Sequence, residues 1–227
     1  MSAPAYERLT ALDSSFLLLE RPHTPLHVAS TITLEAGPLR TAEGGIDAEA
    51  VKRLVAAELH RIPRYRQKLA WIPFTQRPVW VDDDRFNLDY HVRHTSLPRP
   101  GDARQLKRLS ARVMEQSLDP SRPLWEMWVV EGLDDDRFAI ISKVHHCMID
   151  GMSGVDLLKI LLSSSPEHQP AEPQRFIPRR APTPFELWRD EMVRRVRLPF
   201  DAVRSVQAFV TEADDVRREV TSRVRAL

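Results

Sequence analysis

Cysteine is almost absent from this sequence, since its 227 residues include only Cys147. A single thiol excludes an intramolecular disulfide and is typical of a protein in a reducing compartment. Charge of one sign is also lacking, because 33 Lys and Arg residues balance 32 Asp and Glu residues to a net +1. A dedicated nucleic-acid-binding protein has a strong basic bias, so this balance argues against a nucleic-acid partner.

Long apolar runs are missing as well. Stretches such as VDLLKILL are too short to cross a bilayer and contain charges. The N-terminus has no basic region before its brief FLLL patch, which argues against a signal peptide. We therefore expect a cytoplasmic protein whose membrane contact, at the inner face, is peripheral. The 42% hydrophobic content is enough for a globular core.

Hydrophobic periodicity predicts alternating strands and helices. Alternating or β-branched residues predict strands at 27–35, 85–93, 123–133 and 137–146. Helical spacing predicts helices at 46–63, 101–118 and 152–164. Asp47 is the expected cap of the first, and Asp102 with Gln105 forms a capping box for the second. This mixture is typical of an α+β protein.

Proline changes the character of the chain after residue 165. Six prolines between 166 and 184 predict a linker or an arm lying on a surface. Thr183, Pro184 and Glu186 then predict a helix start, and apolar residues keep helical spacing to the end. We predict a domain at 1–165, a linker at 166–182 and an amphipathic helical segment at 183–227.

The heptapeptide HHCMIDG, residues 145–151, lies between a predicted strand and a predicted helix. On an extended strand, His145 and His146 point to opposite sides, so one of them faces a given cavity. Histidine is the natural general base near neutral pH, and a carboxylate such as Asp150 can fix the ring or its loop. Gly151 permits a backbone shape closed to other residues.

Other interpretations of this motif compete. Adjacent histidines cannot easily converge on one metal ion, and neither HExxH nor a paired CxxC is present. A nucleophilic Cys147 is less favoured than a small buried one. Taken separately, either histidine could also be a structural residue of the core. The joint HHxxxDG pattern, however, arises by chance on the order of once in a thousand such chains.

A second segment, RPLWEMW at 122–128, is expected beside the motif strand. Its tryptophans favour core packing. Arg122 and Trp125 are candidates for substrate binding. Arg122 and Glu126 are candidates for a structural pair or for the lining of a channel.

Together, these segments resemble a known family. HHxxxDG after a strand is similar to the active-site signature of the coenzyme A-dependent acyltransferase superfamily. LTALDSSFLLLE, LDPSRPLWEMWVVEGL and RFAIISKVHHCMIDGMSGVDLL resemble the bacterial wax ester synthase/diacylglycerol acyltransferase family through most of residues 6–200. The resemblance implies a chloramphenicol acetyltransferase-like α+β sandwich, with a mixed sheet flanked by helices and a C-terminal helical segment.

The resemblance also implies a reaction. His146 would take the proton from an acceptor hydroxyl, whose oxygen then attacks the thioester of acyl-CoA. The acceptor is diacylglycerol or a long-chain alcohol. The candidate catalytic set also includes His145, which would support the turn or line the pocket, and Asp150, which would hold the loop. Gly151 would have a structural role. No metal and no cofactor are expected, because acyl-CoA is a co-substrate.

The resembled proteins have two similar halves, with the histidine motif on the first. We expect this chain to correspond to the N-terminal half and to need a second acyltransferase half or a partner chain. The lipid substrates also make a peripheral contact with a membrane or lipid droplet an expectation. Two alternatives stay open: a non-catalytic truncated remnant or interaction module, and a condensation-type enzyme that uses carrier-protein thioesters.

Overall fold

The computed structural model describes residues 5–21, 23–149 and 174–197. The chain divides into two compact units. One comprises residues up to Trp71 together with Arg77–Ala181, and the other comprises Ile72–Gln76 and residues from Pro182 onward. The candidate site lies in the first unit.

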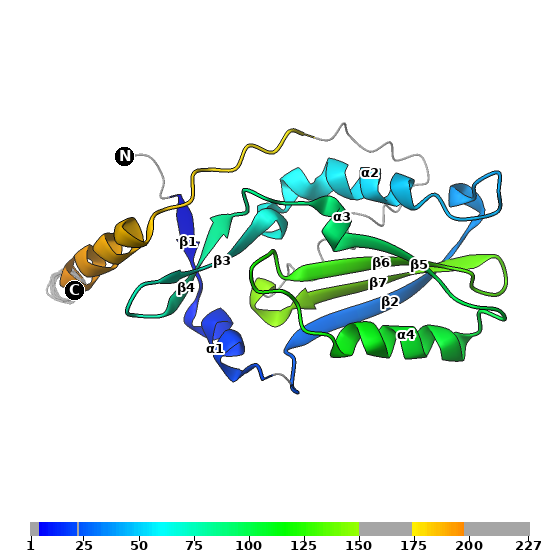
Figure 1. Ribbon diagram of the computed structural model, residues 1–227, viewed down its shortest axis with the longest axis horizontal. Helices are drawn as coiled ribbons and strands as arrows, with labels where there is room; N and C mark the ends of the chain where they lie inside the picture. The colour runs from blue at the N-terminus through cyan, green and yellow to red at the C-terminus, as the bar shows by residue number, and fades with distance from the viewer. Residues whose placement is uncertain (1–4, 22, 150–173, 198–227) are drawn as a thin grey trace, which may run out of the picture. The chain divides into compact units, whose positions relative to one another are not determined.

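A four-stranded mixed sheet is the centre of the first unit (Figure 1). Its order is β2 (His27–Glu35), β7 (Arg137–His145), β6 (Trp125–Glu131) and β5 (Val92–Ser96). β7 is antiparallel to both neighbours, and β5 is parallel to β6. The register pairs His27 with His145 at the end of the sheet where the motif begins.

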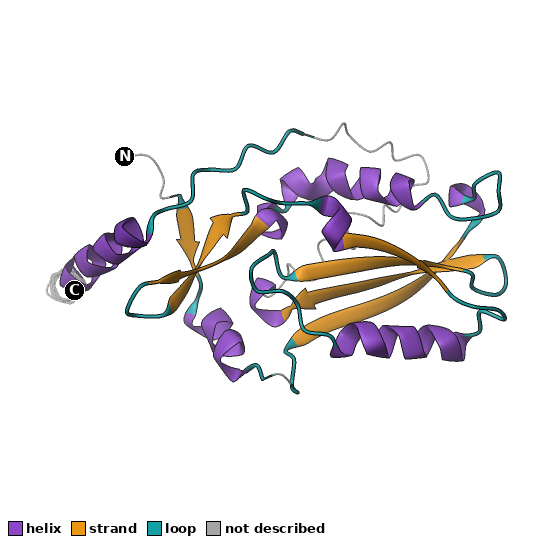
Figure 2. Ribbon diagram, in the orientation of Figure 1, coloured by secondary structure: helices purple, strands orange, loops and turns teal. Residues whose placement is uncertain are grey.

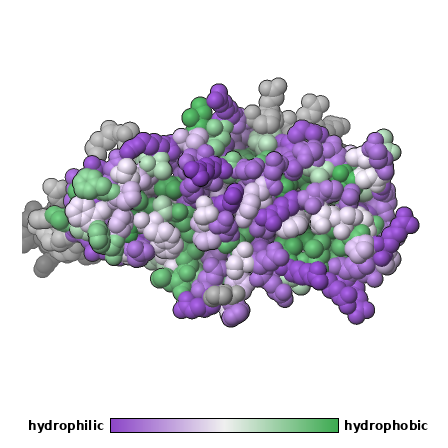
Figure 3. Space-filling view, viewed as in Figure 1, coloured by the Kyte–Doolittle hydropathy of each residue, from purple (hydrophilic) through white to green (hydrophobic). Residues whose placement is uncertain are grey.

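Helices cover both faces of this sheet (Figure 2). Alternation along the strands sends Met127, Val129 and Ile140 into the core that contains α2 (Ala48–Glu58). Ala139 and Ile141 pack with α4 (Ala103–Glu115) on the other face. The surface in Figure 3 is mostly hydrophilic or neutral, with hydrophobic residues in small separate areas. The α+β architecture with a mixed sheet flanked by helices is therefore confirmed.

The predicted helix caps are present. Asp47 accepts the Ala50 amide at the start of α2, and the Asp102–Gln105 capping box starts α4. The prediction at 46–63 ran too far, because α2 ends at Glu58 and is followed by the short 3₁₀ helices η2 (Leu59–Arg61) and η3 (Pro63–Arg66). In the second unit, a helix begins at Pro184 and its described part reaches residue 197. Thr183 and Glu186 exchange side-chain-to-backbone hydrogen bonds at its start, as predicted.

The strand predicted at 85–93 is wrong for most of its length. Residues Leu88–His91 form a helical turn, α3, and β5 begins only at Val92. Asn87 caps that turn by accepting the Asp89 amide, and the turn brings His91 into the core. There its Nδ1 lies 2.8 Å from the Trp125 carbonyl oxygen, and its ring stacks on Trp125. Leu88 and Val92 do pack in the core, but their spacing there comes from a helical turn followed by a strand.

Burial of His91 predicts a pH dependence of stability. Burial lowers the pKa of His91 to about 4, although the Trp125 carbonyl opposes the shift. Between pH 6.5 and 4 the unfolded state therefore binds more protons, so stability falls as the pH falls. The full effect is of the order of 3 kcal/mol. The pKa values of His27 and His145 are also lowered by burial and add to the loss.

We expect His91→Asn to lose less unfolding free energy between pH 7 and pH 4.5 than the wild type does. An asparagine amide can still donate to the Trp125 carbonyl oxygen but does not titrate. Denaturant unfolding at both pH values measures the difference, with the exposed His23→Asn as the matched control. An equal loss in wild type and His91→Asn would contradict the assignment.

Several elements were not predicted. A second sheet joins β1 (Tyr6–Arg8), β4 (Arg77–Asp82) and β3 (Gln67–Ile72) in that order. Helix α1 (Ala11–Leu19) is capped by Thr10, whose hydroxyl accepts the Asp13 amide. A 3₁₀ turn, η1 (Gly37–Leu39), follows β2.

Part of the prediction lies outside the described residues. This applies to the helix at 152–164, most of the Pro-rich segment, the apolar spacing after 203, and Asp150 and Gly151 of the motif. Residues 174–183 contain neither helix nor strand, in agreement with their proline content. Within the described ranges, no helix is both long and apolar enough to span a bilayer.

One arginine connects the Pro-rich arm to the end of β4 within the first unit. The Arg179 amide, Nε and Nη2 all donate to the Asp82 carboxylate, at 3.0, 3.0 and 2.8 Å. These bonds lower the pKa of Asp82 to about 2. Phe176, nearby on the arm, lies under the Arg66 guanidinium.

Arg179→Ala should release the arm, with a stability loss of only about 1 kcal/mol because the guanidinium is half-exposed. Hydrogen exchange of the residue-179 amide should accelerate at least about tenfold, since its bond to Asp82 opens locally. Exposed Arg175→Ala is the control. Unchanged exchange in Arg179→Ala would contradict this role.

Candidate active site

The motif begins where β7 ends. His145 is the last residue of the strand, and His146 opens the 3₁₀ turn η4 (His146–Met148). The His146 amide donates to the Leu26 carbonyl oxygen at 2.9 Å, which extends the β2–β7 ladder to the turn. The His145 Nδ1 accepts the Cys147 amide at 3.1 Å. The turn that carries His146 is therefore fixed on both sides.

His145 is enclosed, with 1% of its surface exposed. Its Nε2 lies 3.3 Å from Oε2 of Glu20, and its ring meets that of His27 edge-on. Burial lowers the pKa of His145, opposed by Glu20. His145 is therefore neutral near pH 7, and its contacts fit the predicted role of supporting the turn.

His146 has different surroundings. Its half-buried ring stacks on Phe16 of α1, with centroids 4.0 Å apart and planes 25° apart. Its Nδ1 is buried and has no hydrogen-bond partner in the described part of the chain. Stacking fixes the plane of the imidazole, and the incomplete burial leaves part of it accessible. A ring oriented in this way is suited to a general base.

Cys147 is poorly suited to act as a nucleophile. The thiol is buried, and burial raises its pKa, which opposes formation of a thiolate. In the part of the chain that the structure describes, no group of three or more His, Cys, Asp or Glu residues is arranged as metal ligands.

RPLWEMW lies in and beside β6. Trp125 is buried in the core, where its Nε1 donates to the Tyr65 carbonyl oxygen at 2.8 Å. Arg122 lies over the Tyr90 ring and 3.4 Å from Asp119. It also lines a cavity of about 560 Å³ with Lys68, Asp83, Asp84, Arg85, Asn87 and Ser121. Substrate binding by Arg122 or Trp125 stays a prediction.

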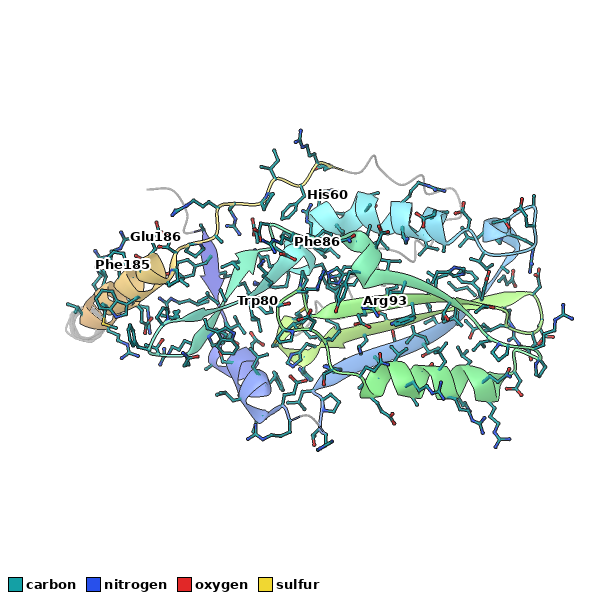
Figure 4. The ribbon with its side chains drawn as sticks, in the orientation of Figure 1. His60, Trp80, Phe86, Arg93, Phe185 and Glu186 are labelled. Atoms are coloured by element: carbon teal, nitrogen blue, oxygen red, sulfur yellow. The ribbon has the colours of Figure 1, made fainter. Side chains whose placement is uncertain are left out.

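Glu126 has structural partners. The buried carboxylate lies 3.5 Å from Arg93 and 3.8 Å from Lys143. Figure 4 labels Arg93, which belongs to β5 of the four-stranded sheet. The guanidinium also lies over the Tyr90 and Trp128 rings. Glu126 therefore has a structural role, but the predicted pair with Arg122 is not seen among the described residues, because Arg122 lies near Asp119 instead.

Sequence reasoning missed three side chains around the motif: Phe16, Glu20 and His27. Figure 1 shows α1 next to the end of β7 and the start of β2. The missed signal is spacing, because Asp13, Phe16 and Glu20 recur at intervals of three and four residues, which places them on one helix face.

The sequence matches the model of the wax ester synthase/diacylglycerol acyltransferase catalytic domain over residues 9–227. The chain belongs to this wax ester synthase/diacylglycerol acyltransferase family. A probable diacylglycerol O-acyltransferase of Mycobacterium tuberculosis, tgs3, is 40% identical over 177 residues, which are 77% of this chain and 63% of the relative. Another, tgs1, is 43% identical over 159 residues, 69% of this chain and 33% of the relative.

The solved structures agree with this family membership. The wax ester synthase/diacylglycerol acyltransferase of Marinobacter aquaeolei VT8 superposes with a TM-score of 0.59 and 29% identity, over 73% of this chain and 41% of that one. The first condensation domain of the CDA synthetase shares the fold, with a TM-score of 0.54 and 15% identity, over 70% of this chain and 39% of that one. The chain thus spans between a third and just under two thirds of the length of these family members.

Proposed function

We propose that the protein takes part in an acyl-CoA-dependent O-acyl transfer with His146 as the general base. The acceptor is the hydroxyl of diacylglycerol or of a long-chain alcohol, giving a triacylglycerol or a wax ester. The observation that carries the proposal is the His146 ring, held at the end of β7 by Phe16, in a chain of this family.

The proposed step is a direct transfer. His146 accepts the hydroxyl proton while the alcohol oxygen bonds to the thioester carbonyl carbon. The carbon–sulfur bond then breaks, and coenzyme A leaves as the thiol with that proton. An acyl-enzyme is not required, in keeping with the buried Cys147 thiol. General base catalysis of this kind contributes about 10²–10⁴-fold in rate.

Other parts of the proposal rest on the family. Acyl-CoA and a lipid alcohol are the proposed substrates, with no bound cofactor. A second acyltransferase half, in the same chain or in a partner, is proposed to complete the cleft. Asp150 and Gly151 are proposed to hold the loop after His146. We place the protein in the cytoplasm, in peripheral contact with a membrane or lipid-droplet surface where its substrates lie.

A thioester-consumption assay tests the function. Palmitoyl-CoA and diolein are supplied to this chain alone. They are also supplied to this chain extended by any polypeptide that is encoded directly after Leu227. We expect coenzyme A release to match triacylglycerol formation. A reaction that requires an acyl carrier protein as the donor would favour the condensation-type alternative. No turnover in either form would favour the non-catalytic remnant.

A further inference from the structure

One carboxylate lies between two buried histidines next to the motif. Glu20, the C-cap residue of α1, places Oε1 3.3 Å from the Nε2 of His27 and Oε2 3.3 Å from the Nε2 of His145. Its Oε1 also accepts the Leu26 amide at 3.3 Å. Neither histidine contact has the direction of a hydrogen bond, so both are electrostatic contacts. His27 and His145 face each other across the β2–β7 register.

The contacts of His145 indicate which of its ring nitrogens carries the proton. The Cys147 amide is a donor, so the Nδ1 of His145 that accepts it is unprotonated. A neutral imidazole carries one proton, which must then lie on Nε2. That nitrogen is the one facing the Glu20 carboxylate. In the other tautomer, the Nδ1–H of His145 would face the N–H of the Cys147 amide, which is unfavourable. The unprotonated Nε2 would then face the Glu20 carboxylate with its lone pair, which is also unfavourable.

The tautomer of His145 therefore bears on His146. The Cys147 amide that His145 accepts is the next peptide group after His146, so losing this bond loosens the turn. Helix α1 contributes a second contact, because Phe16 lies four residues before Glu20 and stacks on the His146 ring. One face of α1 thus restrains both the turn and the ring.

We propose that Glu20 is a positioning residue that selects the Nε2–H tautomer of His145 and thereby fixes the turn presenting His146. The expected effect on the reaction rate rests on the proposed function. Glu20 acts through His145 and does not contact the reacting atoms.

The test begins with the tautomer. Long-range ¹⁵N–¹H NMR of the histidine-labelled chain near pH 7.5 distinguishes protonated from unprotonated ring nitrogens. In the wild type we expect a protonated Nε2 and an unprotonated Nδ1 for His145. In Glu20→Gln, which removes the charge at nearly constant size, a population with protonated Nδ1 should appear. Glu20→Asp should retain the wild-type tautomer, and exposed Glu43→Gln should resemble the wild type.

Kinetic measurements then test the effect of Glu20 on kcat. They use this chain alone or its extended form, depending on which one turns over. Glu20→Gln should lower kcat about 10- to 100-fold, as outer partners that orient a histidine do, with little change in KM for acyl-CoA. Glu20→Asp should restore part of kcat. A merely structural role would instead lower the melting temperature and change kcat in proportion to folded protein.

The outcomes separate the two proposals. An Nδ1–H tautomer in the wild type, which needs no variant, would overturn the inference. So would an unchanged tautomer in Glu20→Gln, or a changed tautomer with unchanged kcat. If the tautomers are as expected but neither this chain nor its extended form turns over, the proposed function is contradicted. The role of Glu20 is then limited to fixing the turn.

Discussion

Replacing His146 with alanine is expected to reduce kcat for acyl transfer about 10²–10⁴-fold, because the proton of the acceptor hydroxyl loses its base. The fold should survive the change. The side chain contributes a stacking contact with Phe16, worth at most about 1.5 kcal/mol, and its backbone bond to Leu26 is retained. Initial rates of coenzyme A release with palmitoyl-CoA and diolein measure the effect, with the melting temperature as the check on folding.

Two variants make this result specific. Exposed His23→Ala should keep wild-type rates, and Cys147→Ala should keep kcat within a few-fold, since the proposed direct transfer does not use the buried thiol. Near-normal turnover by folded His146→Ala would remove this residue from the mechanism. A large kcat loss in Cys147→Ala with an unchanged melting temperature would instead point to a covalent route.

Replacing Lys143 with methionine should lower the free energy of unfolding by about 3 kcal/mol, a larger effect than most single substitutions have. Lys143 is fully buried, and its Nζ donates to the carbonyl oxygens of Val113 and Gln116, each at 2.8 Å, at the end of α4. It also lies 3.8 Å from the buried Glu126 carboxylate. Methionine fills the space of the stem but leaves those acceptors without a donor.

Denaturant unfolding at pH 7 measures the loss, and Lys107→Met on the exposed face of α4 is the matched control, expected within about 0.5 kcal/mol of the wild type. The double variant Lys143→Met with Glu126→Gln should recover part of the stability, because it removes the uncompensated charge. If Lys143→Met is as stable as Lys107→Met, the buried ammonium contributes no net stabilisation.

The sequence predicted the elements with a clear apolar pattern. β2 has β-branched alternation, β6 and β7 are short apolar runs buried on both faces, and α4 has helical spacing with a capping box at its start. Helix α1 contradicts this rule. Leu12, Leu18 and Leu19 are 65–69% exposed, whereas Asp13 is buried against the motif turn. The inward face of this helix therefore combines the polar Asp13 with the partly buried Phe16 and Leu17, while its other leucines stay exposed.

The candidate site was predicted to a similar extent. His146 and the supporting place of His145 follow from a local motif at a strand end. Glu20 and His27 are distant from that motif in sequence and reach it only through the pairing of β2 with β7. The failed strand at 85–93 has the same origin, since the bond from His91 to Trp125 joins residues 34 positions apart. Such contacts leave no periodic signal in a single sequence.

Chemical rescue tests the assignment of His146 as the base most directly. Imidazole is added to His146→Ala at a pH where it is mostly the free base, and coenzyme A release is followed with palmitoyl-CoA and diolein. We predict that the rate rises with imidazole concentration, that ester product rises in step, and that the wild type is unaffected. When diolein is omitted, we expect the rate with imidazole to fall to the rate of His146→Ala without imidazole. A rate that stays flat at every imidazole concentration, or thioester loss without ester formation, would contradict the account.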